Sequence, residues 1–288
     1  MSATDKLKRL LNGPDILITP GCHDAMTAKL IQRAGFPAAF MGGFAVSASR
    51  IGMPDTGLIS YAEMADQGRN ICEAVSIPMF GDGDTGYGNA INVQRTVRGY
   101  AQAGFACIMI EDQVAPKRCG HTRGKQTVSR GEAFARIQAA TDARDAGSDI
   151  LIMARTDANA TEGLEEAIFR AKTFAEMGAD ITFLEAPRNK AEMHAYCDRV
   201  PGPKMANMVE QGKTPLLSPT ELQEIGYKIV AYPLTLMFAG IQAMESALLK
   251  LRSGETPLNL TEFQHLRDII GFPEYYEAEK KYVAEHGV

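Results

Sequence analysis

The chain has 288 residues, of which 45% are hydrophobic and 23% are charged, and its formal net charge at pH 7 is −5. This balance is typical of a globular protein with a sizeable core, and the lack of a long basic tract argues against nucleic acid as a partner. We find no apolar run of roughly 18 residues and no apolar segment near the first residue, so we expect neither a membrane span nor a signal peptide.

Short apolar or β-branched runs recur along the chain, and helical stretches with apolar residues three or four positions apart lie between them. Alternating strands and helices predict a parallel sheet, and eight such units predict a closed (β/α)8 TIM barrel, which has no free sheet edge. The predicted strands are residues 16–19, 38–41, 77–80, 107–110, 150–154, 181–184, 204–206 and 228–232. The clearest predicted helices are residues 24–34, 92–103, 130–146, 164–177 and 192–199.

The pattern changes after the eighth predicted strand. A long apolar helix is predicted over residues 236–251, followed by a Gly/Pro break at 253–257 and a polar helical segment with several aromatic residues. These aromatic side chains exceed the needs of a solvated tail, so we expect them to pack on the barrel or on a neighbouring subunit. We therefore assign residues 1–252 to the barrel and residues 253–288 to a helical extension of the same domain.

Polar side chains follow several of the predicted strands. A lone Asp after a strand usually forms a turn or caps a helix. Functional groups of a barrel collect at the C-terminal strand ends, however, so matching positions in successive units indicate a site. Carboxylates at such a site favour a hard cation. The residues are Asp82, Asp84, Glu111, Arg155, Asp157, Glu185, Asn207 and Glu210.

Two motif interpretations of the segment after the third predicted strand can be rejected. Residues 81–86 match G-x-G-x-x-G, but their variable positions include two acids, which would repel a pyrophosphate. The same segment begins like a calcium loop, yet Tyr87 replaces the required glycine and Val93 the bidentate glutamate. One or two carboxylates on Mg²⁺ or Mn²⁺ remain, with other positions left for water and substrate oxygens.

Cys119 lies in the segment Lys-Arg-Cys-Gly-His of residues 117–121, with Lys125 nearby. Cationic neighbours stabilise a thiolate, and Pro116 and Gly120 predict a loop that substrate can reach. The basic loop thus indicates a small anionic substrate and a proton donor. A zinc ligand, for which no second Cys or His pair is present, and a simple exposed thiol stay open as alternatives. The five scattered cysteines predict reduced thiols and a cytoplasmic protein.

Several segments together resemble the isocitrate lyase/phosphoenolpyruvate mutase superfamily, and within it the branch of the 2-methylisocitrate and 2,3-dimethylmalate lyases. They run in order from about residue 10 to 250, so the resemblance covers nearly the whole chain. The matching segments are residues 52–55, 82–88, 111–113, 117–121, 154–158, 185–186 and 206–210.

The resemblance implies a role for each candidate residue. It implies Mg²⁺ (or Mn²⁺) bound by Asp82, with Asp84 and Glu111 acting partly through water and Asp55 as a further acidic member. It implies that Cys119 donates a proton from a loop that closes over the substrate, and that Glu185 has an outer-shell or base role. The implied contacts to substrate are Arg155, His121, Asn207, Lys117, Gly120 and the backbone of Gly42 and Gly43. The resemblance also implies a helix swapped between subunits and a homotetramer.

Four positions depart from the pattern of the methylisocitrate enzymes. Gly42 replaces a Ser or Thr, Phe40 a Tyr, Val209 a Thr, and Phe238 an expected Arg. Each change removes a polar or cationic group, so together they argue against a tricarboxylate substrate.

The resemblance therefore predicts an Mg²⁺-dependent carbon–carbon lyase. It would cleave a 2-hydroxy dicarboxylate of the 2,3-dimethylmalate or 2-alkylmalate type into a 2-keto acid such as pyruvate and a carboxylate. The alternatives are 2-methylisocitrate cleavage, oxaloacetate hydrolysis or decarboxylation, and P–C chemistry like that of carboxyphosphonoenolpyruvate mutase. A non-catalytic barrel that senses an organic anion is a further alternative, but binding alone needs no proton donor.

Overall fold

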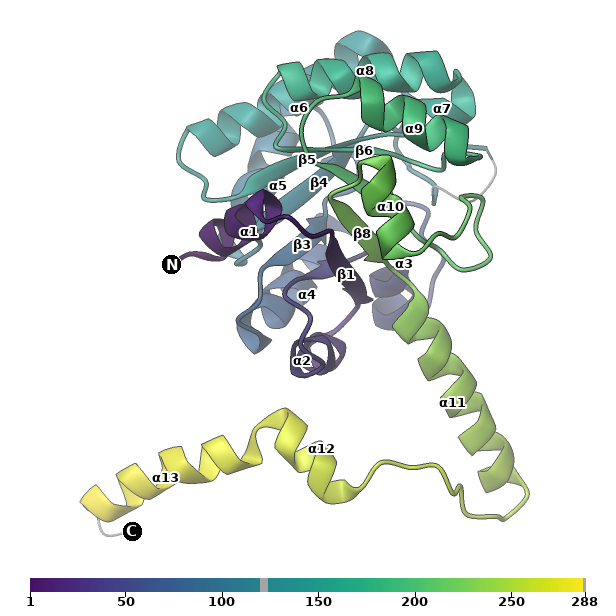
Figure 1. The fold of residues 1–288 in the computed structure, drawn as a ribbon. Helices are drawn as coiled ribbons and strands as arrows, with labels where there is room; N and C mark the ends of the chain where they lie inside the picture. The colour runs from purple at the N-terminus through teal and green to yellow at the C-terminus, as the bar shows by residue number, and fades with distance from the viewer. Residues whose placement is uncertain (120–123, 287–288) are drawn as a thin grey trace. The chain divides into compact units, whose positions relative to one another are not determined.

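The predicted barrel is confirmed. The computed structural model describes residues 1–119 and 124–286, and its sheet is a closed barrel of eight parallel strands (Figure 1). Each strand pairs with the next along the chain, and β8 pairs with β1, where Leu17 lies opposite Ile229. The strands are β1 (Leu17–Cys22), β2 (Ala39–Met41), β3 (Met79–Asp82), β4 (Cys107–Glu111), β5 (Leu151–Thr156), β6 (Ile181–Leu184), β7 (Lys204–Asn207) and β8 (Ile229–Tyr232).

Helices cover the outside of the sheet in Figure 1. Those predicted from the sequence are α2 (Ala25–Arg33), α5 (Ala90–Gln102), α6 (Arg130–Asp145), α8 (Leu164–Glu176) and α9 (Lys190–Arg199). The others in this part of the chain are α1 (Ala3–Asn12), α3 (Gly43–Val46), the π-helix η1 (Ser47–Ile51), α4 (Tyr61–Ala74), α7 (Ala158–Thr161) and α10 (Pro219–Ile225).

The sequence analysis gave no bounds for α1, α4 and α10. The buried positions of α1 include Thr4 and those of α4 include Gly68, so neither helix has a fully apolar stripe. Their N-terminal signals were readable, because Ser2, Ser60 and Ser218 each form a capping box with the acid three residues later.

The interior of the barrel is one apolar cluster to which all eight strands contribute. Alternate residues of a strand point to the same face, so Leu151 and Met153 of β5 both enter this cluster, as do Ile181 and Phe183 of β6. Leu7 of α1, which is fully buried, packs on the same cluster. The helices pack outside the strands through two further clusters.

The chain divides into two compact units, Met1–Leu236 and Met237–Val288. The second unit holds most of α11 (Thr235–Arg252), together with α12 (Phe263–Ile270) and α13 (Phe272–His286). No described residue of α11 is buried, and its Met244, Leu248 and Leu249 are each at least 60% exposed. The assignment of residues 1–252 to the barrel and the subunit-swapped helix both stay predictions.

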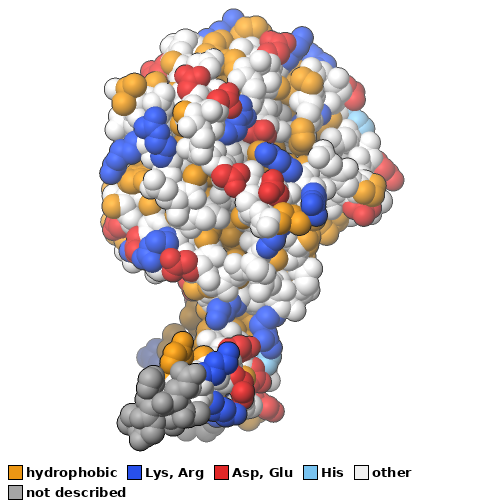
Figure 2. All heavy atoms as spheres, turned by 90° about the vertical axis from the view of Figure 1, so that its left-hand side faces the viewer, with side chains coloured by type: hydrophobic (Ala, Val, Ile, Leu, Met, Phe, Trp, Pro, Cys, Tyr) orange, Lys and Arg blue, Asp and Glu red, His pale blue; other side chains and the backbone are white. Residues whose placement is uncertain are grey.

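Among the described residues, no helix combines the length and apolar character needed to cross a membrane. Figure 2 shows Lys and Arg interspersed with Asp and Glu over one face of the barrel unit. Exposed ion pairs such as Arg199–Glu165 and Lys190–Glu221 also join side chains of opposite charge.

Close packing at Gly68 gives a first prediction. A Cβ atom there would lie 2.3 Å from the buried ring of Phe105, whereas a Cβ at Gly131 of α6 meets nothing within 4 Å. We expect Gly68→Ala to lower the free energy of unfolding by about 1–3 kcal/mol through overpacking. Gly131→Ala, the matched control, should be neutral or stabilise by up to about 1 kcal/mol. Urea denaturation of both variants tests this, and equal midpoints would contradict the packing at Gly68.

Candidate active site

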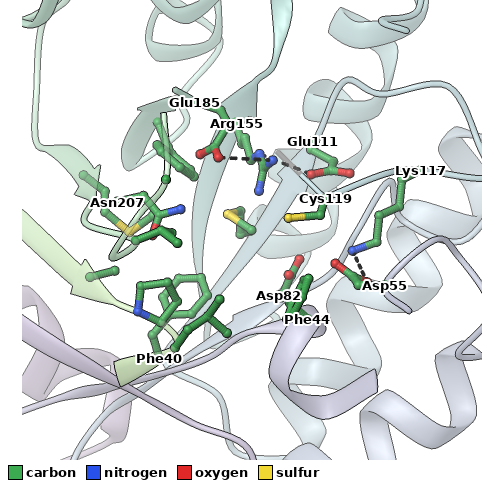
Figure 3. A pocket seen from close by; sticks show the side chains of 18 of the residues that line it. Phe40, Phe44, Asp55, Asp82, Glu111, Lys117, Cys119, Arg155, Glu185 and Asn207 are labelled. Atoms are coloured by element: carbon green, nitrogen blue, oxygen red, sulfur yellow. Dashed lines mark ion pairs between the residues drawn. The ribbon is translucent and has the colours of Figure 1, made fainter. Parts of the chain in front are cut away.

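A cavity of about 240 Å³ lies at the C-terminal ends of the strands, on the side where a barrel carries its functional groups (Figure 3). Asp82 ends β3, Glu111 ends β4, Arg155 lies near the end of β5 and Asn207 ends β7. The structure therefore brings together most of the residues predicted from the sequence. Those lining the cavity are Asp55, Asp82, Glu111, Lys117, Cys119, Arg155, Glu185 and Asn207.

The other predicted residues lie beside the cavity or outside the described chain. Asp84 is buried and reaches the cavity lining through Lys117. The backbone N–H of Gly43 donates to Asp82 Oδ2 at 2.9 Å. Gly42 is the N-cap of α3 and is not among the residues lining the cavity. Gly120 and His121 lie outside the described residues.

One side of the cavity is an acidic cluster around a buried ammonium group. Lys117 Nζ lies 2.6 Å from Asp55 Oδ1 and 2.9 Å from Asp84 Oδ1. Burial opposes the charge on Lys117, but Asp84, Asp82, Asp55 and Glu111 together raise its pKa well above its ordinary value. Burial also raises the pKa of Asp84 to about 6, against the pull of Lys117. The lysine therefore holds a concentration of negative charge in place.

The backbone fixes this acidic cluster closely. The N–H of Asp84 donates to Asp82 Oδ1 at 3.1 Å, and the N–H of Glu111 donates to the carbonyl of Asp84 at 2.9 Å. Asp84 has a φ of 48°, a left-handed conformation that is uncommon outside glycine. A Cβ at position 43 would lie 2.9 Å from Asp82 Oδ2, so only glycine fits there without a shift. The close approach of Asp82 thus explains why position 43 is glycine.

The opposite side of the cavity is built around Arg155. Its Nε lies 2.8 Å from Asp157 Oδ2 and 3.2 Å from Glu111 Oε2, and its Nη2 lies 4.0 Å from Glu185 Oε1. Its guanidinium also lies over the ring of Phe183, 5.3 Å from the ring centre. Burial raises the pKa of Glu111 well above its ordinary value, and Arg155 opposes that shift. Arg155 is thus a buried cation at the edge of the cavity.

Asp157 and Asp112 support Arg155, and the sequence analysis assigned neither a role. Asp157 is fully buried and accepts from both Arg155 and Lys125. Asp112 accepts from the backbone N–H of Asp157 at 2.9 Å and from Arg170 Nη1 at 3.1 Å. The position of Asp157 two residues after a cavity arginine was visible in the sequence, but its partners were not.

Cys119 reaches the cavity from a loop held by a neighbouring side chain. The amide of Gln113 donates to the carbonyl of Arg118 at 2.8 Å and accepts from its N–H at 2.9 Å. Figure 3 shows the sulfur of Cys119 pointing into the cavity between Glu111 and Asp82. A thiol in this position can exchange a proton with a bound molecule.

The remaining wall is mostly apolar, with Arg118 and Gln211 as its polar members. Phe40, Met109, Phe183, Met205 and Ala231 line the cavity and also belong to the barrel-interior cluster, so they form its floor. Further apolar lining comes from Phe44, Val209, Pro233 and Leu234. The site thus combines charged groups on its sides with an apolar floor, as a small-molecule site usually does.

The acidic side fits a divalent cation held partly by ligands outside the protein. Among the described residues, no group of three or more His, Cys, Asp and Glu side chains could by itself hold a metal ion. Mg²⁺ is usually bound through one or two carboxylates, with water and substrate completing its shell. Asp82 and Glu111 line the cavity, and the buried Glu111 Oε1 has no hydrogen-bond partner among the described residues. The donor set therefore suits Mg²⁺ or Mn²⁺.

The family model described as phosphoenolpyruvate phosphomutase matches residues 7–252 of the chain. A 2,3-dimethylmalate lyase of Eubacterium barkeri is 43% identical over 98% of this chain and 99% of its own length. A 2-methylisocitrate lyase of Aeropyrum pernix is 41% identical over 93% of this chain and 87% of its own length.

A solved structure is also similar to this chain, here in fold as well as in sequence. The structure of an oxaloacetate acetylhydrolase in complex with the inhibitor 3,3-difluorooxalacetate has a TM-score of 0.93 and 34% sequence identity to this chain. The alignment covers 98% of this chain and 97% of that one. Proteins acting on different acids therefore share this architecture.

The five cysteines give a prediction about reactivity. Burial raises the pKa of Cys72 and Cys197 to about 12, and raises that of Cys22 and Cys107 well above the ordinary thiol value. Cys119 is partly exposed and lines the cavity. We therefore expect iodoacetamide to alkylate Cys119 first, at least about tenfold faster than the others, because only the thiolate reacts. Peptide mapping by mass spectrometry measures this, with Cys119→Ser as control. Faster labelling of another cysteine would contradict it.

Proposed function

The chain belongs to the phosphoenolpyruvate phosphomutase family and is a carbon–carbon lyase, and we propose that its substrate is a 2-hydroxy dicarboxylate with small alkyl groups. The proposed acids are of the 2,3-dimethylmalate or 2-alkylmalate type, and the products are a 2-keto acid such as pyruvate and a second carboxylate. The relative from Eubacterium barkeri, named for 2,3-dimethylmalate, supports this choice.

One observation carries the proposal. Asp82 and Glu111, Arg155, and the thiol of Cys119 face a single small cavity whose floor is apolar. Carboxylates suit a cation that binds a hydroxy acid, a guanidinium suits a second carboxylate, and a thiol suits proton delivery to carbon. Alkyl groups fit the floor formed by residues such as Phe40 and Phe183.

We assign the steps of the reaction to these groups. A base removes the proton of the substrate hydroxyl, the C2–C3 bond breaks, and its electron pair moves to C3. The hydroxyl oxygen becomes the keto oxygen of the first product. Arg155 and Asn207, with His121, stabilise the charge that develops on the second carboxylate. Cys119 then protonates C3 and releases the second acid, while Glu185 has the outer-shell or base role implied by the resemblance.

Asp82 would hold Mg²⁺, with Asp84 and Glu111 acting partly through water and Asp55 completing the acidic set. Bound Mg²⁺ would act as a Lewis acid that lowers the pKa of the substrate hydroxyl. Lys117 pairs with both Asp55 and Asp84. The backbone around Gly42 and Gly43 would hold the keto-acid carboxylate, and Lys117 and Gly120 would complete the substrate contacts.

Two lining positions support a dicarboxylate over a tricarboxylate, although Arg118 also lines the cavity. A third carboxylate buried without a cation costs several kcal/mol. Phe40 and Val209, which replace polar residues of the methylisocitrate enzymes, both line the cavity. Phe238 belongs to the second compact unit, so its part in this argument stays a prediction.

We further propose a cytoplasmic homotetramer. The five cysteines are an odd, scattered set, which suits a reducing compartment. The exposed apolar side chains of α11, together with Phe263, Tyr275 and Tyr282 of the last helices, suit burial against another subunit. The partner in catalysis is a small organic anion, and we expect neither nucleic acid nor membrane to bind.

Metal removal tests the acidic side. We expect EDTA to abolish turnover and Mg²⁺ or Mn²⁺ to restore it. Asp82→Ala should weaken Mn²⁺ binding by about 100-fold or more. Electron paramagnetic resonance of Mn²⁺ measures this independently of turnover. Asp142→Asn, an exposed control on α6, should bind as the wild type does. Full turnover in a metal-stripped sample would refute this assignment.

The proposed reaction is tested by a screen for keto-acid and oxalate release, in which 2,3-dimethylmalate and 2-methylisocitrate give pyruvate, isocitrate gives glyoxylate, and oxaloacetate gives oxalate on hydrolysis. The acids are 2,3-dimethylmalate, other 2-alkylmalates, 2-methylisocitrate, isocitrate and oxaloacetate. We expect 2,3-dimethylmalate to have a higher kcat/KM than 2-methylisocitrate. Cys119→Ser should bind 2,3-dimethylmalate but lose about 10² in turnover. A tenfold preference for 2-methylisocitrate, about 1.4 kcal/mol of transition-state binding, would overturn the proposed substrate class. Near wild-type turnover by Cys119→Ser would remove Cys119 from the mechanism.

A further inference from the structure

Lys125 makes a buried ion pair behind the cavity. Its Nζ lies 2.8 Å from Asp157 Oδ1, and the exposed fractions of the two side chains are only 3% and 0%. Lys125 is not among the residues that line the cavity, so its side chain approaches Asp157 from the other side. Burying a lysine without a partner would destabilise the folded protein, so the buried position of Lys125 depends on its ion pair with Asp157.

The backbone around Lys125 is also fixed. The N–H of Val114 donates to the carbonyl of Gln126 at 2.8 Å, and the N–H of Val128 donates to the carbonyl of Asp112 at 2.9 Å. These two hydrogen bonds form a short antiparallel ribbon, with a bridge between Gln113 and Thr127. The segment carrying Lys125 is therefore tied to the strand end that carries the acidic side of the site.

Neighbouring carboxylates already neutralise part of the positive charge of Arg155. Its guanidinium faces the carboxylates of Asp157, Glu111 and Glu185, which compete with a substrate carboxylate for the same positive charge. Asp157 is the nearest of the three and is bonded to both Nε and Nη2 of Arg155. Its Oδ1 is shared between Arg155 Nη2, at 3.1 Å, and Lys125 Nζ. Lys125 thus offsets the charge of the group that most strongly neutralises Arg155.

We propose that Lys125 is a positioning residue that acts through Asp157 to keep Arg155 oriented for a substrate carboxylate. This inference rests on the proposed role of Arg155 as the carboxylate receptor. Burial opposes ionisation of Asp157, but the charges of Arg155 and Lys125 outweigh it and lower the pKa of Asp157 below its ordinary value. Asp157 therefore stays ionised and holds both cations in register.

A double-mutant cycle on anion binding tests the proposal. The probe is oxalate, measured by isothermal titration calorimetry with Mg²⁺ present, on wild type, Lys125→Met, Asp157→Asn and the double variant. We expect Lys125→Met to weaken oxalate binding by about tenfold, the size of one charged interaction. In the Asp157→Asn background the same change should cost less than about twofold, because the charge it offsets is gone.

Two further variants separate charge from packing. Lys125→Gln keeps a hydrogen-bond donor and should lose affinity nearly as Lys125→Met does, while Lys172→Met, an exposed control on α8, should bind as the wild type does. Thermal midpoints identify any variant that fails to fold, and Lys125→Gln then takes the place of Lys125→Met in the cycle. Wild-type oxalate affinity in Lys125→Gln, or equal losses in both backgrounds, would overturn the proposal.

The outcome is distinct from that of the screen for keto-acid and oxalate release. If no 2-hydroxy acid is cleaved but the oxalate cycle shows coupling, the proposed reaction fails and the role of Lys125 stands. If pyruvate is released and the two changes are additive, the reaction stands and the role of Lys125 fails.

Discussion

Closure of the parallel sheet is the constraint on which the rest of the molecule depends. Eight strands running the same way bring all their C-terminal ends to one rim, so Asp82, Glu111 and Arg155, far apart in sequence, meet around one cavity. The same closure removes these acids from water. Buried carboxylates at this density require cations, and the chain supplies Lys117 on one side and Arg155 with Lys125 on the other. The fold that brings these acids together therefore also has to supply the cations that pair with them.

The loop after β4 supplies a lysine to each of the two groups of buried charges. Lys117, near its start, pairs with Asp55 and Asp84, and Lys125, on its return, pairs with Asp157. Gln113 fixes the backbone just before Cys119. A thiol that must meet a transient carbon anion gains from such double anchoring, because misplacement of about 1 Å can cost 10²-fold in rate.

The sequence predicted the strands well because buried parallel strands are short apolar runs, and all eight were found with ends shifted by a few residues. It predicted the acidic residues of the rim because strand ends follow from the strands. It gave no bounds for α4, where Gly68 interrupts the apolar stripe to admit Phe105. It also gave Asp157 no role, because its bond to Lys125 joins residues 32 positions apart, and such a pair depends on side-chain directions that no local pattern encodes.

The apolar floor of the cavity belongs to the same column of side chains that fills the barrel down to Leu7 of α1. Phe40, Phe183 and Met205 therefore have two roles. Each packs in the barrel interior that holds the sheet closed, and each bounds the space offered to a ligand. Substitutions that enlarge this floor to accept a bulkier acid must also weaken the packing of the barrel interior. Diversification is then easier at the loop-borne walls, such as Val209 and Leu234, where volume can change without disturbing the column.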